Sequence, residues 1–374
     1  MDNETLLSLH TNQRLLLQEL IARGIKVELL VRELELAEAR LGDHVELLLD
    51  RDSSACPYAG SVICADKYLT KKLLARAGIE VPRGEQFFAD QREDALAFAA
   101  SLPFPQVVKP AHGSHGLGCT TDCEDEDDVA RAIDNAVIWC GQNGAFLIEE
   151  QRPGMEFRIF ISRRGKYAVL HRDPASVVGD GRHSIRALCE RESQRRMNPR
   201  RNCLCPIVLD AVVEAFLARQ GLDLDSVPRA GSKVYLRRNS NVALGGDCED
   251  FTAAAHPTFI TLARRALEVF PGLPYAGVDV LASDISAPAG PGRCTLLEVN
   301  SNPGLHIHMR PARGAPQNVA AYAADMIFPE TAKEDRWSTD SSALPPTPYT
   351  TTRRLESTSA SPAPKTLRAW SPVF

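Results

Sequence analysis

The chain has 374 residues, of which 24% are charged and 44% are hydrophobic, and its formal net charge at pH 7 is -5. These values are typical of a soluble globular protein with about two or three lobes, and the acidic balance gives no electrostatic support for nucleic-acid binding. The ten cysteines contain no CxxC pair, so they indicate reduced thiols rather than a zinc framework.

The N-terminal stretch predicts a small α/β domain over residues 1–64. Leucines at helical spacing predict a helix over Thr5–Arg23 that ends at Gly24, and strands are expected over Ile25–Val31 and His44–Leu49. The first leucine run follows no basic region and is too short for a signal peptide or a membrane helix. We therefore expect a cytoplasmic protein without membrane contacts.

The next predicted helix covers Lys67–Ala77, because Asp66 is a good N-cap residue and Gly78 a good C-cap residue. This helix carries Lys71 and Lys72 side by side. Lysines on a helix surface are usually solvated, so only their surroundings in the fold can make one of them a ligand for phosphate.

A glycine-rich loop, Ala111–Gly118, follows a predicted strand, Phe104–Lys109, that ends in a lysine. The three glycines of this loop free the backbone to turn its N–H groups toward an anion, and Lys109 adds a positive charge. A surface hairpin is the alternative interpretation, because the loop matches neither a Walker loop nor a GxGxxG motif.

Two predicted strands, Phe146–Glu150 and Met155–Phe160, are separated by a Pro-Gly bend. A strand, a sharp bend and a second strand with alternating charges are typical of a hinge between two lobes. Glu156 and Arg158 are expected on one face of the second strand, since side chains alternate along a strand.

The remaining segments are predicted from local patterns. The acidic run Asp122–Asp128 predicts the start of a helix to about Trp139. Arg191–Arg201 predicts a solvated basic helix, because it lacks the interleaved aromatic residues of a nucleic-acid site. The other expectations are a loop over His171–Gly181, a strand over Val234–Arg237, an amphipathic helix over His256–Phe270 and a disordered Ser/Thr/Pro-rich tail over residues 331–374.

Oxygen-bearing side chains follow two apolar strands near the end of the patterned region. Tyr275–Ala282 carries Asp279 in its middle, and Thr295–Val299 carries Glu298 and is followed by Asn300. If the two strands are neighbours, the three side chains converge, and such oxygens suit Mg²⁺ completed by phosphate oxygens. The alternative is a buried acid paired with Arg or Lys, or a chance strand end.

Taken as a set, six motifs resemble the ATP-grasp carboxylate–amine ligases, and most closely the ATP-grasp half of the bifunctional glutathione synthetases and cyanophycin synthetase. The motifs are ADKYLTKKLLARAGIEVP, VVKPAHGSHGLG, PASVVGDGRHSI, VYLRRNSNVALGG, AGVDVLA and LEVNSNPGLHIH. The resemblance implies an α/β (α+β) chain with the ATP-grasp fold. Two α+β lobes over residues 65–330 would grip ATP, with a hinge near residues 149–156, after the small N-terminal domain and before the tail.

The resemblance also implies roles for individual residues. ATP would be bound by Lys71, Lys109, Gly113, Ser114, Gly116, Gly118, Glu149, Glu150 and Glu156. Mg²⁺, with Mn²⁺ as an alternative, would be held by Asp279, Glu298 and Asn300. Arg158 and Arg237 would steady the acyl phosphate during catalysis. The substrate side would be lined by Ser176, Asn239, Asn241, His306 and His308.

The chain departs from the glutathione-type pattern in two places. Asp173 and Ser176 frame the Pro-Ala of a segment that typically reads Val-Pro-Ala-Asn in that family. After His308 the sequence Met-Arg-Pro-Ala-Arg-Gly lacks the usual trailing basic pair. We therefore expect a different substrate, and a different means of holding its carboxylate.

The chemistry that the resemblance implies is amide formation through an acyl phosphate, with release of ADP and phosphate. The first expectation is a γ-glutamyl-type peptide ligase that joins glutamate or a γ-glutamyl compound to an amino acid. Its binding partners would be small amino-acid or dipeptide substrates. A homodimer is the oligomeric state that we consider. The alternatives are a cyanophycin-type ligase, a non-catalytic regulatory module that binds nucleotide, and a transition-metal site at His306 and His308, which share a strand-like spacing but lack a third ligand.

Overall fold

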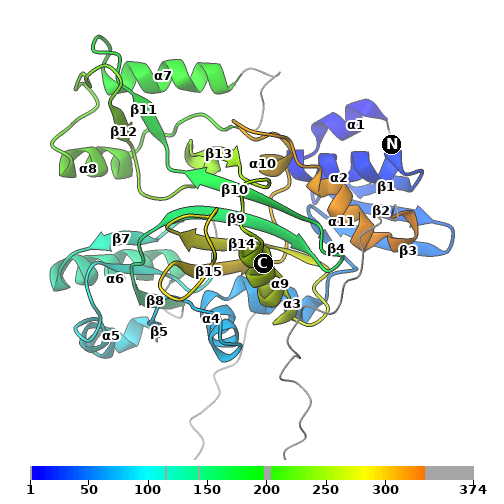
Figure 1. Cartoon of the computed structure of the whole chain (residues 1–374), viewed down its shortest axis with the longest axis horizontal. Coiled ribbons are helices and arrows are strands. Elements are labelled where there is room, and N and C mark those ends of the chain that lie inside the picture. The colour runs from blue at the N-terminus through cyan, green and yellow to red at the C-terminus, as the bar shows by residue number, and fades with distance from the viewer. Residues whose placement is uncertain (1, 114–115, 142–143, 198–203, 333–374) are drawn as a thin grey trace, which may run out of the picture. The chain divides into compact units, whose positions relative to one another are not determined.

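The computed structural model describes residues 2–113, 116–141, 144–197 and 204–332, in which helices surround antiparallel sheets (Figure 1). The predicted mixed α/β (α+β) class is thereby confirmed. Ser114 of the glycine-rich loop and the tail from residue 333 lie outside the described residues. The helices of this part of the chain are α1 (Asn3–Ser8), α2 (Thr11–Ala22), α3 (Tyr58–Ala65), α4 (Lys67–Arg76), α5 (Arg92–Ala99), α6 (Glu126–Cys140), α7 (Ile185–Arg196), α8 (Ala211–Arg219), α9 (Pro257–Glu268), α10 (His306–Met309) and α11 (Val319–Ile327), with short 3-10 helices at Ala89–Gln91, Val242–Leu244 and Pro329–Thr331.

The N-terminal strands form one antiparallel sheet in the order β1 (Lys26–Val31), β2 (Leu36–Leu41), β3 (His44–Leu49) and β4 (Asp52–Ser53). β2 is absent from the predicted strands, because its Ala, Glu and Arg residues are more typical of helices. The helix predicted over Thr5–Arg23 is instead the pair α1 and α2, since the backbone at Leu9 is extended.

The core of this N-terminal sheet is shared with distant parts of the chain. Leucines of α2 and alanines of β2 pack with α11 and with Phe160 and Tyr275 of another sheet. At the edge of this core, Nη1 of Arg23 lies 2.7 Å from Oδ1 of Asp325 in α11, and Nη2 donates to the carbonyl of Ala321 at 3.0 Å. The domain boundary predicted at residue 64 stays a prediction.

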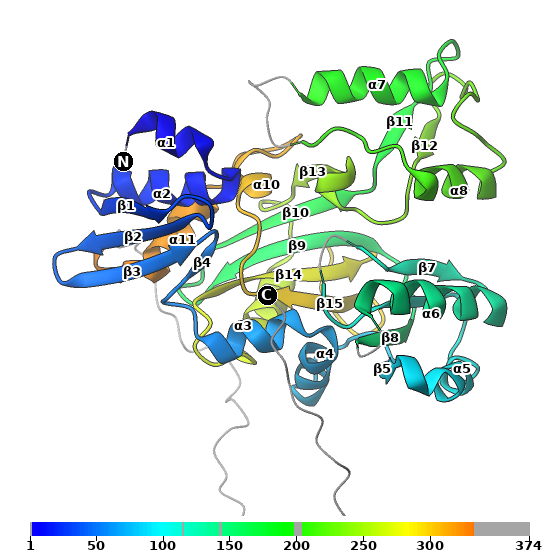
Figure 2. The same cartoon turned by 180° about the vertical axis from the view of Figure 1, so that it is seen from behind.

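A second sheet has the strand order β5-β8-β6-β7, with β5 (Gly84–Phe88), β6 (Gln106–Pro110), β7 (Thr120–Cys123) and β8 (Ala145–Glu150). α5 and α6 pack against it through a common apolar core (Figure 2). The helix predicted from the acidic run is α6, and the Asp125 side chain caps it by accepting from the backbone N–H of Asp128.

The central sheet has the order β13-β10-β9-β14-β15, with β9 (Met155–Ser162), β10 (Tyr167–Asp173), β13 (Asp247–Asp250), β14 (Tyr275–Ala282) and β15 (Cys294–Asn300). α9 packs on one face of this sheet (Figure 1). The hinge predicted near residues 149–156 covers the end of β8 in the second sheet, the connecting residues 151–154 and the start of β9 in the central sheet.

A smaller unit with its own apolar core is inserted between β10 and β13. It contains α7, α8 and the two-stranded sheet of β11 (Ser176–Val178) and β12 (Lys233–Tyr235). The loop predicted over His171–Gly181 is therefore partly wrong, because β10 extends to Asp173 and β11 pairs with a strand far along the chain.

The stretch after β15 folds as a helix where the sequence indicates a strand-like spacing. His306 and His308 lie on α10, a four-residue helix, so they do not share one strand face. Within the described ranges, no helix combines the length and the apolar character that a membrane span requires.

Candidate active site

One buried carboxylate on an inner strand of the second sheet lies between two lysines. Glu149 on β8 forms ion pairs with both Lys71 of α4 and Lys109 of β6. Burial alone would raise the pKa of Glu149, but Lys109 and Lys71 outweigh burial and lower the pKa to about 2. The resemblance implies that the two lysines bind the phosphates of ATP and that Glu149 lies at its adenine and ribose end, and the structure places the three side chains together.

The two lysines leave this cluster with more positive than negative charge. Burial lowers the pKa of Lys71 to about 8, even though Glu149 opposes this. For Lys109 burial also acts to lower the pKa, but Glu149 outweighs it and the pKa is raised. One carboxylate cannot neutralise two ammonium groups, so the cluster favours a further anion.

A third lysine, Lys67, was not among the predicted site residues. Its Nζ donates to the carbonyl of Gly113 at 2.6 Å, which ties the start of α4 to the glycine-rich loop. Burial lowers the pKa of Lys67, and Glu298 is the strongest of the charges that oppose this shift. The local sequence does not indicate a ligand here, because Lys67 directly follows the N-cap Asp66 and so resembles an ordinary first helical residue.

The glycine-rich loop makes close contacts where it re-enters the described chain. Gly116 has φ +73°, and a Cβ there would lie 2.9 Å from Nδ2 of Asn239. Gly118 has φ +68°, and its Cβ would lie 2.8 Å from the Trp139 side chain. Only glycine adopts this backbone freely, and its lack of a side chain lets the loop approach Asn239.

A row of charged residues crosses three strands of the central sheet. In the strand register, Asp279 on β14 lies opposite Glu298 on β15 and opposite Arg158 on β9. The condition for convergence of Asp279 and Glu298, that β14 and β15 are neighbours, is met. Arg158 binds Asp279 through two hydrogen bonds of 2.6 Å and lies 3.6 Å from Glu298.

Arg172 extends this row and is a site residue that the sequence analysis missed. Its Nη2 lies 2.9 Å from Oδ2 of Asp279 and also forms an ion pair with Glu156. Glu156 in turn accepts from the hydroxyl of Ser240. Arg172 falls in a segment predicted as a loop. Only a strand prediction over β10 could have placed it on the face of Arg158, because Arg172 shares a strand face with Leu170, which lies opposite Arg158.

The predicted metal ligands differ in their freedom to bind a cation. Both oxygens of Asp279 accept from arginines and the side chain is 1% exposed, so it matches the alternative of a buried acid paired with Arg. Burial would raise its pKa, but Arg158 and Arg172 lower it. Glu298 keeps 32% of its side chain exposed, and it accepts from Nδ2 of Asn300 at 3.1 Å.

The donor set of this row therefore fits a hard cation through Glu298 and Asn300, with Asp279 beside them. In the described residues no group of three or more His, Cys, Asp or Glu side chains is arranged to hold a metal ion. The suggested transition-metal site is not supported by the surroundings of His306, whose Nδ1 lies 2.8 Å from Oδ1 of Asn12.

Several residues predicted for catalysis, for the substrate side or for ATP binding have contacts away from this row. Arg237 is buried and binds the carbonyl of Val208 and the carboxylate of Asp210 in the inserted unit. Ser176 pairs with Tyr235 between β11 and β12, and the Asn241 side chain accepts from the N–H of Ala243. Glu150 accepts from the N–H of Arg83 rather than from a lysine of the cluster.

His308 is buried close to the charged row and has unsatisfied ring nitrogens. Neither nitrogen has a hydrogen-bond partner among the described residues. Burial lowers its pKa to about 3, and the nearby Arg158 acts in the same direction. His308 is thus a neutral imidazole at the site.

Comparison with known proteins identifies a recognised domain in this region. Residues 66–151 match the family model described as the ATP-binding domain of the carbamoyl-phosphate synthase L chain. The chain is 35% identical over 274 residues to cyanophycin synthetase of Geminocystis herdmanii, covering 72% of this chain and 31% of that protein. It is 34% identical over 326 residues to the glutathione biosynthesis bifunctional protein of Streptococcus thermophilus, covering 85% of this chain and 42% of that protein.

A solved structure extends the similarity to the fold. The bifunctional glutathione synthetase of Pasteurella multocida superposes with a TM-score of 0.61 at 31% sequence identity, covering 85% of this chain and 44% of that chain. This chain thus spans less than half the length of each of these three relatives.

Proposed function

The chain carries an ATP-grasp domain related to those of cyanophycin synthetase and bifunctional glutathione synthetase, and from this premise we propose that it is an ATP-dependent ligase that joins a carboxylate to an amine. The observation that carries the proposal is the buried Lys71–Glu149–Lys109 cluster, whose excess positive charge suits nucleotide phosphates. Lys67 lies beside this cluster and contacts the glycine-rich loop.

The proposed reaction has two steps. A carboxylate oxygen of the donor attacks the γ-phosphorus of ATP, the bond to the bridging oxygen breaks, and ADP leaves. The amine nitrogen of the acceptor then attacks the carbonyl carbon of the acyl phosphate and loses a proton, and inorganic phosphate leaves with the electron pair of the C–O bond. Phosphorylation is needed because a carboxylate is a poor electrophile.

The protein's contribution is to position the reactants and stabilise charge. The lysines of the cluster hold the nucleotide phosphates, and Arg158 and Arg172 fix the carboxylate row so that it need not reorganise during the reaction. The glycine-rich loop excludes water from the acyl phosphate. Arg237 would steady the acyl phosphate from the inserted unit, where its ion pair with Asp210 fixes its position.

Mg²⁺, or Mn²⁺ in its place, is the cofactor that the row suits. Glu298 and Asn300 would hold it, with Asp279 as the neighbouring carboxylate. When bound, such an ion neutralises charge that develops on the transferring phosphoryl oxygens.

The substrate class that we propose is a γ-glutamyl donor or glutamate together with an amino acid. Support comes from the names of the relatives, one of which acts in glutathione biosynthesis and the other of which makes cyanophycin. The segment with Asp173, which forms an ion pair with Lys233, departs from the glutathione-type pattern. A cyanophycin-type donor is therefore the second candidate.

The test is a screen of donor and acceptor pairs with ATP and Mg²⁺. We expect amino-acid-dependent release of ADP and inorganic phosphate, and a hydroxamate when hydroxylamine replaces the acceptor. Lys71→Met should abolish turnover, whereas Lys72→Met, in the adjacent residue with 53% of its side chain exposed, should retain it. Release of AMP and pyrophosphate would overturn the mechanism, and tight ATP binding without turnover for every pair would favour the regulatory module.

A further inference from the structure

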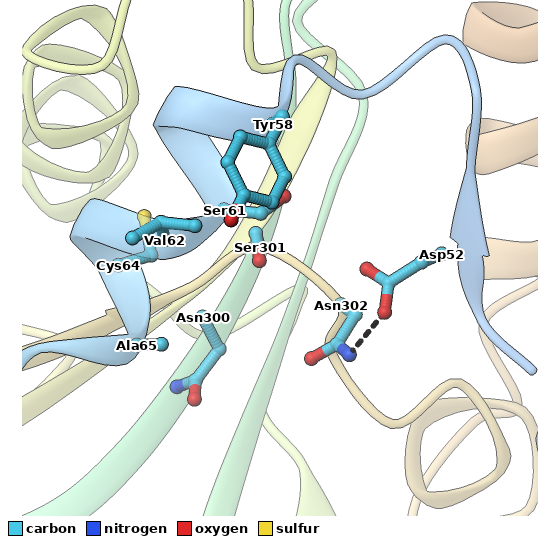
Figure 3. Close-up of a pocket in the computed structure, with 9 residues that line it drawn as sticks. All are labelled: Asp52, Tyr58, Ser61, Val62, Cys64, Ala65, Asn300, Ser301 and Asn302. Atoms are coloured by element: carbon cyan, nitrogen blue, oxygen red, sulfur yellow. Dashed lines mark hydrogen bonds between the residues drawn. The ribbon is translucent and has the colours of Figure 1, made fainter. Parts of the chain in front are cut away.

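A pocket with one carboxylate in its wall lies between the N-terminal sheet and the end of β15, next to the charged row. Its volume is about 300 Å³, and its walls come from β4, from the nearby α3 and from a segment that is far from both in the sequence (Figure 3). α3 contributes Tyr58, Ser61, Val62, Cys64 and Ala65, the end of β15 and the residues after it contribute Asn300, Ser301 and Asn302, and β4 contributes Asp52.

Asp52 is the one charged residue among the residues that line this pocket. One of its carboxylate oxygens, Oδ2, accepts from Nδ2 of Asn302 at 2.9 Å, as Figure 3 shows. In the described residues the other oxygen has no hydrogen-bond donor, and no Lys, Arg or His nitrogen forms an ion pair with Asp52. The nearby Arg51 pairs with Asp50 instead, at 3.0 Å.

A carboxylate that is partly removed from water and has no cationic partner favours a positively charged ligand. Burial raises the pKa of Asp52, although the hydrogen bond from Asn302 and the nearby Arg51 act to lower it. No Lys, Arg or His lines the pocket, so the carboxylate of a ligand would find no ion-pair partner beside Asp52. The pocket chemistry thus selects an amine.

We propose that this pocket binds the ammonium group of the carboxylate donor, with Asp52 as its counter-ion. The inference rests on the proposed function and names the substrate class of that site. Asn300 lines the pocket and also donates to Glu298 of the charged row. A donor with its ammonium on Asp52 therefore directs its reacting carboxylate toward Asn300 and the phosphate site, away from the negative charge of Asp52.

This arrangement makes the donor an amino acid, or a short peptide with a free amino group, rather than a simple organic acid. An acid of the same length without the amine leaves Asp52 partly buried and without an ion-pair partner, and that loss is large because hydrogen bonds to charged groups contribute more than neutral ones.

The experiment compares glutamate and γ-glutamylglycine with their deamino counterparts, glutarate and glutarylglycine. We expect Asp52→Asn to raise the KM for the amine-bearing donor about ten- to a hundredfold and to leave the KM for ATP unchanged. Against the deamino compound the variant and the wild type should be alike. The asparagine can still accept from Asn302, so the fold should be kept, which thermal unfolding measures.

The matched control is Asp43→Asn, in the exposed turn between β2 and β3 of the same sheet. It should leave both KM values unchanged. An Asp52→Asn enzyme that still prefers the amine-bearing donor would overturn the proposal.

Calorimetric titration of the same four compounds separates this inference from the proposed function, since binding needs no turnover. Tighter binding of the amine-bearing compounds that is lost in Asp52→Asn supports the pocket assignment even if no ADP is released, in which case only the ligase assignment fails. Equal binding of amine and deamino compounds by the wild type would remove the pocket assignment while leaving any ligase activity in place.

Discussion

Asp279 and Glu298 face each other across two strands, but their surroundings give them different functions. Asp279 is buried and clamped by Arg158 and Arg172, whereas Glu298 is partly exposed and lies farther from Arg158. One carboxylate is therefore held within the row, and the other is accessible to a cation.

We predict that Glu298→Gln lowers turnover on the order of 100-fold and leaves thermal stability nearly unchanged. Asp279→Asn should lower turnover and also cost about 3–5 kcal/mol in the free energy of unfolding, because two arginines lose their buried partner. Denaturant unfolding and ADP release measured on both variants test this. Equal stability of the two variants would contradict the structural role of Asp279.

At the residue scale, the sequence predicts those site residues whose neighbours along the chain carry a signal. Lys109 ends a predicted strand before three glycines, and Glu149 is the second-last residue of a predicted strand before a Pro-Gly bend. Arg172 and Lys67 could not be found in this way. Their roles depend on register with β9 and on contact with Gly113, which no local pattern encodes.

Among the elements, the contact between the glycine-rich loop and the segment of Asn239 joins two parts of the chain that are far apart in sequence. A Cβ at Gly116 would reach Nδ2 of Asn239 at 2.9 Å, in addition to the strain of a left-handed backbone, which costs about 1–2 kcal/mol. The side chain of Asn239 can move, so the expected result is a displaced asparagine.

We predict that Gly116→Ala raises the KM for ATP by about tenfold, and that the increase is smaller in an Asn239→Ala background, where the displaced amide is missing. Steady-state kinetics of the two single variants and the double variant give the coupling. Gly42→Ala, with φ +58° and open space around the new Cβ, is the control for strain alone and should leave the KM unchanged. Strict additivity would argue against the contact.

Elements that have their own start and stop signals were predicted well. α4 begins after the N-cap Asp66, and α6 begins in the acidic run. β2 and β11 were missed because each is short or polar and gains its stability from a partner strand. The spacing of His306 and His308 fits a strand as well as a short helix. The helix is favoured by a contact distant in sequence, in which the backbone N–H of Leu305 donates to Oδ1 of Asn12.

For the whole molecule, the buried histidines predict how stability depends on pH. Burial lowers the pKa of His306 to about 4 and of His308 to about 3, below the value of about 6.5 expected in the unfolded chain. Below pH 6.5 the unfolded state binds more protons than the folded state. The free energy of unfolding should therefore fall as the pH drops from about 6.5 toward 4, by up to about 1.4 kcal/mol per pH unit for each histidine.

Urea unfolding between pH 4.5 and 7.5 measures this dependence. His308→Leu should flatten the curve by about one proton. An unaltered slope in His308→Leu would mean that this imidazole takes up its proton over the same pH range in the folded protein as in the unfolded chain.

The core that α2 and β2 share with α11 has a consequence for the order in which the chain can fold. β3 ends at Leu49 and α11 begins at Val319, so roughly 270 residues must be synthesised between them. At typical translation rates that takes on the order of half a minute. During that interval the apolar face of the first sheet to leave the ribosome lacks its final cover, and it is the part of a nascent chain that a chaperone would bind.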